Sequence, residues 1–414
     1  MQEIKKAEKY FLTTTTEGCA TNLIENANYR KILDNASSVE TKRPEEADII
    51  IINTCAFTQN QEDRSVDKIK ELQSTYPSSK VIVGGCLTKI NPKRLKEHYK
   101  EEAFNPGDYE NFSKILDVSY DPTSDKVNFF DDADFNELSL SHNFLFKVRK
   151  VYFSLEGLLG KRLNPIHNII KSAVINEEFF TIQVSQGCAG KCTFCAIKFA
   201  KGHVKSKPIV QILHEFQRGL QNGYKKFWLL GDDIGCYGID LGSDIMQLLR
   251  EILELPHDFE LVINYFEPFF LVKHESEIQD IFRDRRIINV NIPIQSGNDQ
   301  IIKAMGRDYK IYDVARVIRK IKAANPNIAI KTNIIFGFPG ESYSAFKDSI
   351  KALSLFDAIY ALRYTPRPRT RSFSMKTFID KEELSLRNLE IQTRVIMRHI
   401  IVSFRSIARV LIRE

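Results

Sequence analysis

The feature that most constrains this chain is a short loop near its middle that holds three cysteines. The loop reads Gly187-Cys188-Ala-Gly-Lys-Cys192-Thr-Phe-Cys195, so the cysteines stand at the spacing Cys-x3-Cys-x2-Cys. Three thiolates in so short a loop suit a cubane iron–sulfur cluster in which one iron has no ligand from the protein. A substrate or cofactor can bind at such an open iron. A partial zinc site or unconnected thiols are the alternatives, but zinc sites usually contain paired Cys-x2-Cys units.

This triplet, with the aromatic Phe194 just before its last cysteine, resembles the signature of the radical S-adenosylmethionine (SAM) superfamily. The resemblance implies that the amino and carboxylate groups of SAM chelate the open iron. It also implies that an electron from the cluster cleaves SAM to methionine and a 5′-deoxyadenosyl radical. The spacing does not indicate which reaction this radical serves.

The bulk properties are those of a globular protein with two or three domains. The chain has 414 residues, 43% of them hydrophobic and 27% charged. Its start has no apolar core of signal-peptide length, and no later stretch is long enough to span a membrane. We therefore expect a cytoplasmic protein with no membrane partner. Seven cysteines, an odd number, argue against a disulfide framework and for metal ligation.

Residues 1–116 alternate strand and helix patterns, which predicts an α/β domain with a flavodoxin-like parallel sheet. One predicted strand, at 47–55, is a near-continuous apolar run of the kind that is buried on both faces of a parallel sheet. The strands are predicted at 10–15, 47–55 and 80–86, and the helices at 22–33, at 61–72 and from Asn91-Pro92 onward.

A cysteine directly follows each predicted strand of this domain: Cys19, Cys55 and Cys86, separated by 36 and 31 positions. Parallel strands in register place their carboxyl ends at one edge, where such sheets build their sites, so we expect the three cysteines to meet. A single buried cysteine is often just a small core residue. Three at equivalent positions instead indicate a second three-cysteine cluster with another open iron.

Residues 117–178 carry no motif. The acidic, turn-rich stretch 121–134 is predicted to be a linker, and 142–175 one or two helices. From 179 to 375 the pattern predicts a partial (β/α)6 barrel of the TIM type, with its site at the carboxyl ends of the strands. Its strands are predicted at 179–185, 226–231, 260–264, 287–292, 328–335 and 358–362, and its helices include 208–222, 243–254, 309–324 and 342–355.

Three loops after these strands suit SAM. Gly231-Asp232-Asp233 offers carboxylates to a cationic amine and resembles the amine-binding motif of the superfamily, which is usually Gly-Gly-Glu. Gln295 and Ser296 suit a ribose or carboxylate, and the turn at Gly337 permits close backbone approach to an adenine. Each of these loops, taken alone, is an ordinary connection between a strand and a helix. The predicted cofactor-binding residues are Phe194, Gly231, Asp232, Asp233, Gln295, Ser296, Asn333 and Gly337, and no protein acid or base is assigned.

The whole arrangement resembles the radical SAM methylthiotransferases of the MiaB and RimO types, over roughly residues 8–400. The likeness includes the motifs Gly18-Cys19-x-x-Asn22, Asn53-Thr54-Cys55, Gly85-Cys86, Pro293-x-Gln295-Ser296-Gly297, Met305-x-Arg307 and Tyr364-Thr-Pro366-Arg367-Pro368, besides the central triplet.

The resemblance implies two 4Fe–4S clusters, an auxiliary one on Cys19, Cys55 and Cys86 and a radical-generating one on the central triplet. One SAM donates a methyl group to a sulfur on the auxiliary cluster. A second SAM yields the radical, which removes hydrogen from an unactivated C–H bond, and the substrate radical captures the methylthio group. An electron donor such as a flavodoxin or ferredoxin is implied as a partner. Insertion of bare sulfur, electron relay, or a non-catalytic cluster-bearing protein remain alternatives.

The C-terminal segment departs from the family. Members usually end in a small β-rich TRAM domain, whereas residues 376–414 are predicted to be one basic helical stretch without it. From 363 to 414 there are twelve Lys or Arg and five Asp or Glu, an excess of seven positive charges. We therefore rank a peptide or protein residue first as substrate, since that basic end could hold an acidic peptide. A tRNA adenosine is the alternative. We expect a monomer, in which Cys236, the seventh cysteine, is a bystander.

Overall fold

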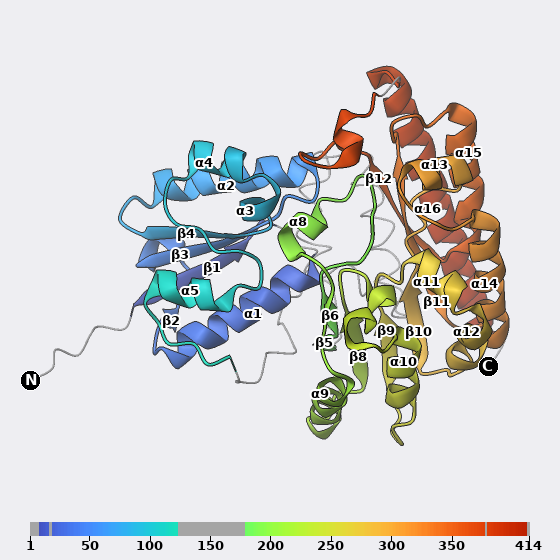
Figure 1. Ribbon diagram of the computed structural model, residues 1–414, viewed down its shortest axis with the longest axis horizontal. Helices are drawn as coiled ribbons and strands as arrows, with labels where there is room; N and C mark the ends of the chain where they lie inside the picture. The colour runs from blue at the N-terminus through green and yellow to red at the C-terminus, as the bar shows by residue number, and fades with distance from the viewer. Residues whose placement is uncertain (1–7, 16–18, 123–178, 377–378, 412–414) are drawn as a thin grey trace, which may run out of the picture. The chain divides into compact units, whose positions relative to one another are not determined.

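The computed structural model describes residues 8–15, 19–122, 179–376 and 379–411 (Figure 1). The chain divides into two compact units. The N-terminal unit consists of Met1–Phe135 together with the later segments Cys195–His203 and Thr365–Phe373, and the second unit holds the rest. The helices predicted at 142–175, and most of the predicted linker, lie outside the described residues.

The N-terminal unit contains a parallel sheet of four strands in the order β2-β1-β3-β4. This order is the one found in flavodoxin-like folds, so the predicted architecture is confirmed. β2 was not predicted because it has only two residues, both exposed, and lacks any apolar pattern. The strands are β1 (Lys9–Thr14), β2 (Val39–Glu40), β3 (Ile49–Thr54) and β4 (Lys80–Gly85).

Helices cover both faces of this sheet (Figure 1). Every residue of β3 is buried, and successive side chains point to opposite faces, so the strand supplies two separate cores. Ile50 and Ile52 pack with one set of helices, and Ile49 and Ile51 pack with the other. The first set is α2 (Gln59–Thr75), α3 (Leu87–Ile90) and α4 (Pro92–His98), and the second is α1 (Ala20–Asn35) and α5 (Tyr109–Leu116).

The two later segments are part of this unit by their packing. α8 (Ile197–Lys201) follows Cys195 and contacts α3. Its neighbour Ala196 is buried in the same core as Leu87, and Phe199 packs against that core. In the other segment, Arg367 is buried and reaches Glu62 in α2.

The second unit contains an open, parallel, six-stranded sheet in the order β12-β11-β10-β9-β8-β5. All six strands predicted for a partial barrel are present. A short antiparallel pair, β6 (Ser185–Gln186) and β7 (Lys205–Ser206), flanks the cysteine loop. The six strands are β5 (Phe180–Gln183), β8 (Lys226–Leu230), β9 (Glu260–Ile263), β10 (Ile287–Asn291), β11 (Ala329–Phe336) and β12 (Ala358–Arg363).

One face of this sheet is apolar and covered by helices, and the other is polar. Residues such as Ile182, Leu229 and Ile330 pack into one large apolar core. Their neighbours in sequence, among them Thr181 and Lys331, are buried on the opposite face. The helices are α9 (Ile209–Gln221), α10 (Ile245–Leu253), α11 (Pro268–Lys273), α12 (Glu275–Phe282), α13 (Asp299–Ala304), α14 (Ile311–Ala324), α15 (Tyr343–Ala352) and α16 (Lys381–Leu411).

The C-terminal segment is helical as predicted, with α16 beginning at Lys381, and its described part exposes apolar side chains as well as basic ones such as Arg394. Leu386, Leu389 and Met397 are 66%, 50% and 48% exposed. Arg387 is buried against Glu341, with its Nη1 3.0 Å from the carboxylate, and Arg398 donates to backbone carbonyls. Much of the described part of this helix therefore presents apolar side chains, while two of its arginines serve the fold. No described helix is long and apolar enough to cross a membrane.

Candidate functional site

Cys19, Cys55 and Cys86 stand at the carboxyl-end edge of the N-terminal sheet, as predicted. Thr54 and Gly85, the last residues of β3 and β4, are register partners, so Cys55 and Cys86 follow matched positions on adjacent strands. Cys19 and Cys86 are also the residues that precede α1 and α3. The charges of Cys19 and Cys55 both act on the thiol of Cys86, which indicates that the three sulfurs lie near one another.

The three thiols are poor acids without a cation. Burial raises the pKa of Cys19 to about 12, and it also raises those of Cys55 and Cys86. A cluster or metal binds thiolates, and its charge lowers a thiol pKa enough to remove the proton. Three mutually close thiols that stay protonated on their own therefore fit a site whose ionisation depends on a bound metal group.

The backbone around these cysteines is held by polar contacts. The N–H of Cys55 donates to the hydroxyls of Thr15 and Ser65, at 3.0 and 3.1 Å. Gly85 has a φ of +93°, and a Cβ there would lie 2.3 Å from Asn53 Oδ1, so only glycine fits before Cys86. Asn22 Nδ2 and Asn53 Oδ1 are buried polar atoms without a partner.

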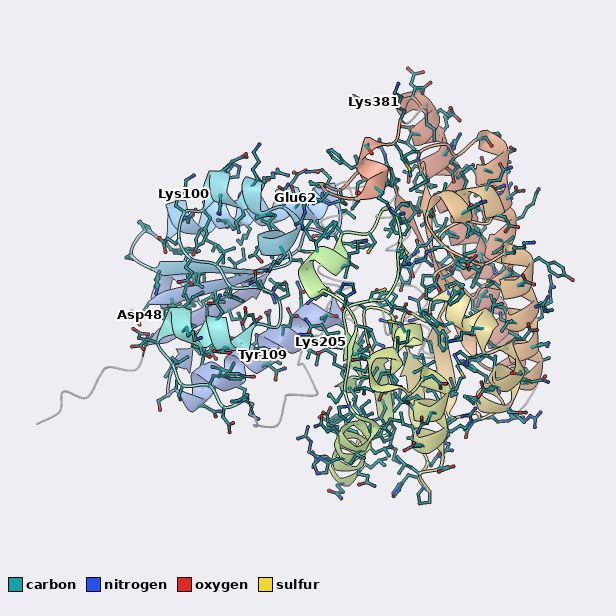
Figure 2. All side chains as sticks on the ribbon, in the orientation of Figure 1. Asp48, Glu62, Lys100, Tyr109, Lys205 and Lys381 are labelled. Atoms are coloured by element: carbon teal, nitrogen blue, oxygen red, sulfur yellow. The ribbon has the colours of Figure 1, made fainter. Side chains whose placement is uncertain are left out.

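Two buried cations belong to this site and were not predicted from the sequence. Lys201 forms an ion pair with Glu25 in α1, and Arg367 forms one with Glu62 on α2. Glu62 is labelled in Figure 2. The charges of both lower the pKa of Cys55, against the larger effect of burial. Each cation lies far from its acid in sequence, so no local pattern could reveal these pairs.

In the second unit, the cysteine loop folds around Gly190. The N–H of Gly190 donates to Cys188 Sγ at 3.1 Å. A Cβ on Gly190 would lie 3.1 Å from Cys188 Sγ and 3.9 Å from Cys192 Sγ, so both sulfurs approach the same backbone position. This convergence of two sulfurs fits the cluster predicted for the loop. Cys195, the third cysteine, belongs to the N-terminal unit by its packing.

The loop is fixed at both ends by hydrogen bonds. Asp232, predicted to contact SAM, accepts from the N–H of Gly187 at 2.7 Å. Thr193 donates through its hydroxyl to Ala304 O at 2.9 Å and through its N–H to Met305 O at 2.8 Å. One oxygen of Asp232 thus positions the cysteine loop, a role that sequence reasoning did not assign to it.

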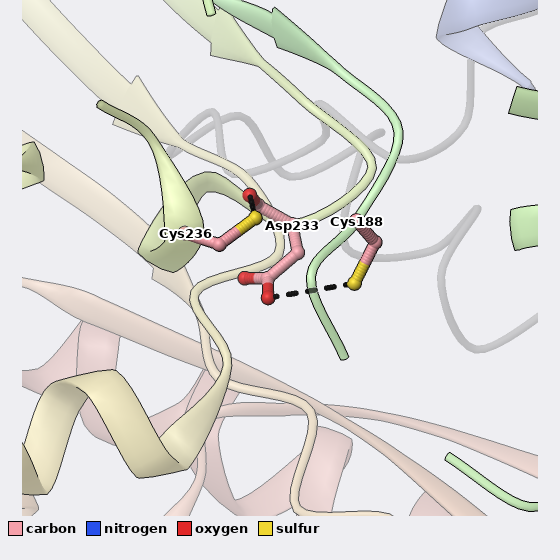
Figure 3. A group of neighbouring side chains, drawn as sticks. All are labelled: Cys188, Asp233 and Cys236. Carbon is pink, nitrogen blue, oxygen red and sulfur yellow. Dashed lines mark hydrogen bonds between the residues drawn. The ribbon is translucent and has the colours of Figure 1, made fainter. Parts of the chain in front are cut away.

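Cys236, which the sequence analysis treats as a bystander, lies beside Cys188. The ligand atoms of Cys188, Asp233 and Cys236 all lie within 4.8 Å of one another (Figure 3). The Cys236 thiol donates to Asp233 O at 3.0 Å, and Cys188 Sγ lies 3.7 Å from Asp233 Oδ2. The neighbouring Cys236 thiol is the main cause that lowers the pKa of Cys188 to about 7. Burial, together with the negative charges of Cys188 and Glu267, raises the pKa of Asp233 well above its usual range.

A buried arginine also faces this loop. Arg307 pairs with Glu267 at 3.1 Å, and its guanidinium lies over the ring of Phe194 at 6.0 Å. Its Nε is buried without a partner. Its charge lowers the pKa of Cys192, although burial of that thiol raises the pKa more. Arg307 belongs to the motif Met305-x-Arg307, which was recognised in the sequence. The residue itself was not predicted to lie in the site.

The remaining residues predicted to contact SAM differ in whether their polar atoms are available to bind a ligand. Gln295 has a φ of +60°, and its Oε1 and Asn333 Oδ1 are buried without partners, so both side chains could accept from a ligand. Ser296 is fully buried and bonds within its own turn, which favours a structural role. Gly337 has a φ of +75° and donates its N–H to Glu341 at 2.7 Å. At Gly231 a Cβ would lie 2.7 Å from Ser185 Oγ.

Comparison with known proteins assigns both units. Residues 182–353 match the radical SAM superfamily, and residues 10–106 match Uncharacterized protein family UPF0004. Among solved structures, a radical SAM methyltransferase, TsrM from Kitasatospora setae, covers 89% of this chain, with 77% of its own length matched, 14% identity and a TM-score of 0.57. That likeness concerns the fold. Together with the cysteine loop, the first match defines this protein as a radical SAM enzyme, which implies a 4Fe–4S cluster and SAM.

Sequence relatives narrow the class. A probable threonylcarbamoyladenosine tRNA methylthiotransferase of Pyrococcus abyssi is 30% identical over 360 residues, which are 85% of this chain and 76% of the relative. The ribosomal protein uS12 methylthiotransferase RimO of Carboxydothermus hydrogenoformans is 28% identical over 383 residues, 90% of this chain and 79% of the relative. The chain belongs to the radical SAM methylthiotransferase family.

Proposed function

We propose that this enzyme inserts a methylthio group at an unactivated C–H bond of a tRNA nucleoside of the threonylcarbamoyladenosine kind, using two 4Fe–4S clusters. The observation that carries the proposal is the arrangement of six cysteines in two sets of three. Each set leaves one iron of a cubane without a protein ligand. When bound, one cluster with SAM supplies a radical that removes hydrogen, and the other supplies the sulfur.

The chain's own residues have binding and positioning tasks in this proposal. Asp232 and Thr193 hold the radical-site loop in place through its backbone. The partnerless oxygens of Gln295 and Asn333 are available to hydroxyl or amine groups of SAM. At the other set, Thr15 and Ser65 fix the backbone of Cys55.

The substrate class is proposed from the relatives, and this reverses the order in which the sequence ranked the candidates. A peptide substrate was ranked first because a basic C-terminal end could hold acidic side chains. Arg387 and Arg398 instead contact Glu341 and backbone carbonyls within the fold, so they do not supply that surface. Several of the most similar relatives, from Pyrococcus abyssi to Thermotoga maritima, are named as threonylcarbamoyladenosine tRNA methylthiotransferases.

The experiment that tests this function is a competition between substrates. Reconstituted enzyme is incubated with SAM, a reductant, and either tRNA with and without the threonylcarbamoyl group or ribosomal protein. Digests are then searched by mass spectrometry for the gain of one methylthio group. We expect the gain on the modified nucleoside, together with 5′-deoxyadenosine and S-adenosylhomocysteine. A gain found only on a protein residue would establish the second candidate, which the RimO relative supports.

Two triple variants separate the roles of the cysteine sets. Replacement of Cys19, Cys55 and Cys86 by Ala is expected to leave SAM cleavage intact while methylthio product disappears. Replacement of Cys188, Cys192 and Cys195 by Ala is expected to abolish both. If the first variant still forms methylthio product, the assignment of a sulfur-supplying cluster to the N-terminal set is wrong.

A further inference from the structure

A buried ion pair at the C-terminal helix has no part in the function proposed above. Arg387 in α16 pairs with Glu341, its Nη1 lying 3.0 Å from Glu341 Oε2, and the two side chains are 2% and 0% exposed. Removing two charges from water costs free energy that their mutual attraction often fails to offset. Apolar side chains of similar size would often hold a helix as well, so the stability of α16 alone does not account for the pair.

The carboxylate of Glu341 holds the turn that precedes α15. Its Oε2 accepts from the N–H of Gly337 at 2.7 Å as well as from Arg387, which also donates to the backbone carbonyl of Glu341 at 3.1 Å. Gly337 has a φ of +75°, and a Cβ there would lie 2.5 Å from Leu384 Cδ1. α16 therefore acts on this turn twice, through Leu384 directly and through Arg387 by way of Glu341.

The guanidinium of Arg387 is fixed in its orientation from two sides. Its Nε and Nη2 donate to Glu383, one turn earlier in α16. It also lies over the rings of Phe346 and Tyr343 in α15, at 5.5 and 5.9 Å from their centroids, and α15 contacts α16 (Figure 1). The planar fork of an arginine can serve two carboxylates and stack on aromatic rings at once, which a lysine ammonium cannot do. The position of the cation is therefore as well defined as its charge.

The same turn packs against the cysteine loop. Phe338, the residue after Gly337, is fully buried, and its ring meets that of Phe194 edge to face, with the centroids 6.4 Å apart. Phe194 stands directly before the third cysteine of the loop. Gly337 and Phe194 are both among the residues predicted to contact SAM. The contacts that begin at Arg387 thus extend through Glu341 and its turn to two of the predicted SAM contacts.

Arg387 also favours the ionised form of Glu341. Burial raises the pKa of Glu341 to about 7, and the N–H of Gly337 and the charge of Arg387 act in the opposite direction. Loss of the cation would raise this pKa further, so the carboxyl group would hold its proton at neutral pH. A hydrogen bond to an ionised carboxylate is stronger than one to a neutral acceptor, so the hold of Glu341 on the turn would weaken.

We propose that Arg387 is a positioning residue for SAM, which acts through Glu341 to hold the Gly337 turn in the conformation that receives the adenosine end of the cofactor. The proposal rests on the radical SAM chemistry of the proposed function and on the predicted contact between this turn and SAM. It does not depend on which substrate is methylthiolated. α16 then forms part of the support of the cofactor site, although none of its residues was predicted to act there.

The first experiment measures hydrogen exchange in the anaerobically reconstituted full-length protein without SAM. Wild type is compared with Arg387→Met and with the double variant Arg387→Met/Glu341→Gln, which removes both charges in case the single variant fails to fold with Glu341 unpaired. We expect a peptide covering residues 335–342 to exchange severalfold faster in Arg387→Met, while peptides from β8 and β9 keep their rates. Arg394→Met is the matched control, because Arg394 is exposed in the same helix, and it should leave exchange of the turn unchanged.

The second experiment measures the binding of SAM to the same proteins by equilibrium titration. Methionine is the second probe, because it lacks the adenosine. We expect Arg387→Met to weaken SAM binding about tenfold, the order of one lost hydrogen bond to a charged group, and to leave methionine binding unchanged. Arg387→Lys keeps the charge without the planar fork, so it should recover part of the affinity for SAM.

Wild-type exchange of the turn, or wild-type affinity for SAM, in a folded Arg387→Met or double variant would overturn the proposal. Equal weakening of methionine binding would also contradict it, as would equal loss of protection throughout the second unit, because either result indicates general loosening. If the wild-type enzyme bound no SAM, the proposed function would be refuted together with this inference. SAM binding that is independent of Arg387 would refute the inference alone.

Discussion

Arg367 and Glu62 form a buried ion pair although 305 residues separate them in the sequence. Their side chains are 2% and 1% exposed, and Arg367 also donates to Gln59 at 3.2 Å. Glu62 accepts in addition from Arg94 at 2.8 Å. A segment near the end of the chain is thereby part of the unit that begins it, and this unit carries the first set of cysteines.

Replacement of Arg367 by Met should loosen the N-terminal unit. The change leaves Glu62 buried with one cation fewer, and breaking a buried pair costs on the order of 3 kcal/mol. Hydrogen exchange of peptides from α2 and β3 should show a matching fall in protection. Arg369→Met is the control from the same segment. Arg369 is exposed, donates to the backbone carbonyl of Lys89 and lies over the ring of Phe199 at 4.3 Å. Among the described residues it pairs with no buried acid, so its replacement should change protection less. Equal effects of the two variants would contradict a special role for the pair.

The alkylation of Cys188 in the metal-free protein should depend on pH with a midpoint near neutrality. The neighbouring Cys236 thiol lowers the pKa of Cys188 to about 7, so the thiolate of Cys188 is scarce below that pH and reaches a plateau above it. Cys19, with a pKa of about 12, should react slowly over the same range. In Cys236→Ala the midpoint should move upward, toward the usual thiol value of about 8.5. An unmoved midpoint, measured by mass spectrometry of labelled peptides, would show that Cys236 does not act on Cys188.

Gly190→Ala should impair cluster loading at the central loop without unfolding the protein. The new Cβ would lie 3.1 Å from Cys188 Sγ, closer than an ordinary contact, and 3.9 Å from Cys192 Sγ. Cys188 Sγ would have to shift by a few tenths of an ångström, whereas the contact with Cys192 Sγ is an ordinary one. Iron content after reconstitution should fall toward that of the variant lacking the central cysteines. Lys191→Ala, at the neighbouring exposed position, should keep its iron, and retention of full iron by Gly190→Ala would count against the loop geometry.

Gly85→Ala should destabilise the N-terminal unit strongly. The residue has a φ of +93°, and a Cβ would lie 2.3 Å from Asn53 Oδ1 and 2.4 Å from Thr54 O. Strain in the left-handed region alone costs about 1 to 3 kcal/mol, and the clash with backbone adds to it. Thermal unfolding followed by circular dichroism should report the loss. Gly202→Ala is the comparison: its φ of +77° imposes similar strain, but no atom lies within 4 Å of the added Cβ, so the loss should be smaller.

The sequence was sufficient for those parts of the fold that have a local pattern. The apolar runs at β3 and β8 are continuous and bounded by turns, so these strands could be placed, together with Cys55 directly after β3. β2 has only two exposed residues and no such pattern. α11 and α12 follow one another with a single residue, His274, between them, and their short apolar faces were not recognised as helices.

The cysteines of the site could be predicted from the sequence, whereas the buried ion pairs near them could not. The chain has only seven cysteines, so a regular spacing between them indicates a shared site. Lysine, arginine and glutamate are common, and the partners Lys201 and Glu25 stand 176 positions apart. Nothing in the residues around Lys201 distinguishes it from Lys198, which lies three positions earlier. The closeness of Cys236 to Cys188 likewise depends on how the turn after β8 folds back, which no spacing rule describes.

Because of these buried pairs, the N-terminal unit can be completed only after residues from much later in the chain have been synthesised. Glu25 and Glu62 leave the ribosome early, but their partners Lys201 and Arg367 follow only much later in the chain. At 5 to 20 residues per second, the interval between Glu62 and Arg367 is roughly 15 to 60 seconds. During that time Glu62 has only Arg94 of its two cationic partners, and Glu25 lacks Lys201 until that residue has also been made. The first domain to be translated is therefore among the last to be completed, and insertion of iron there before translation ends would meet an unfinished site.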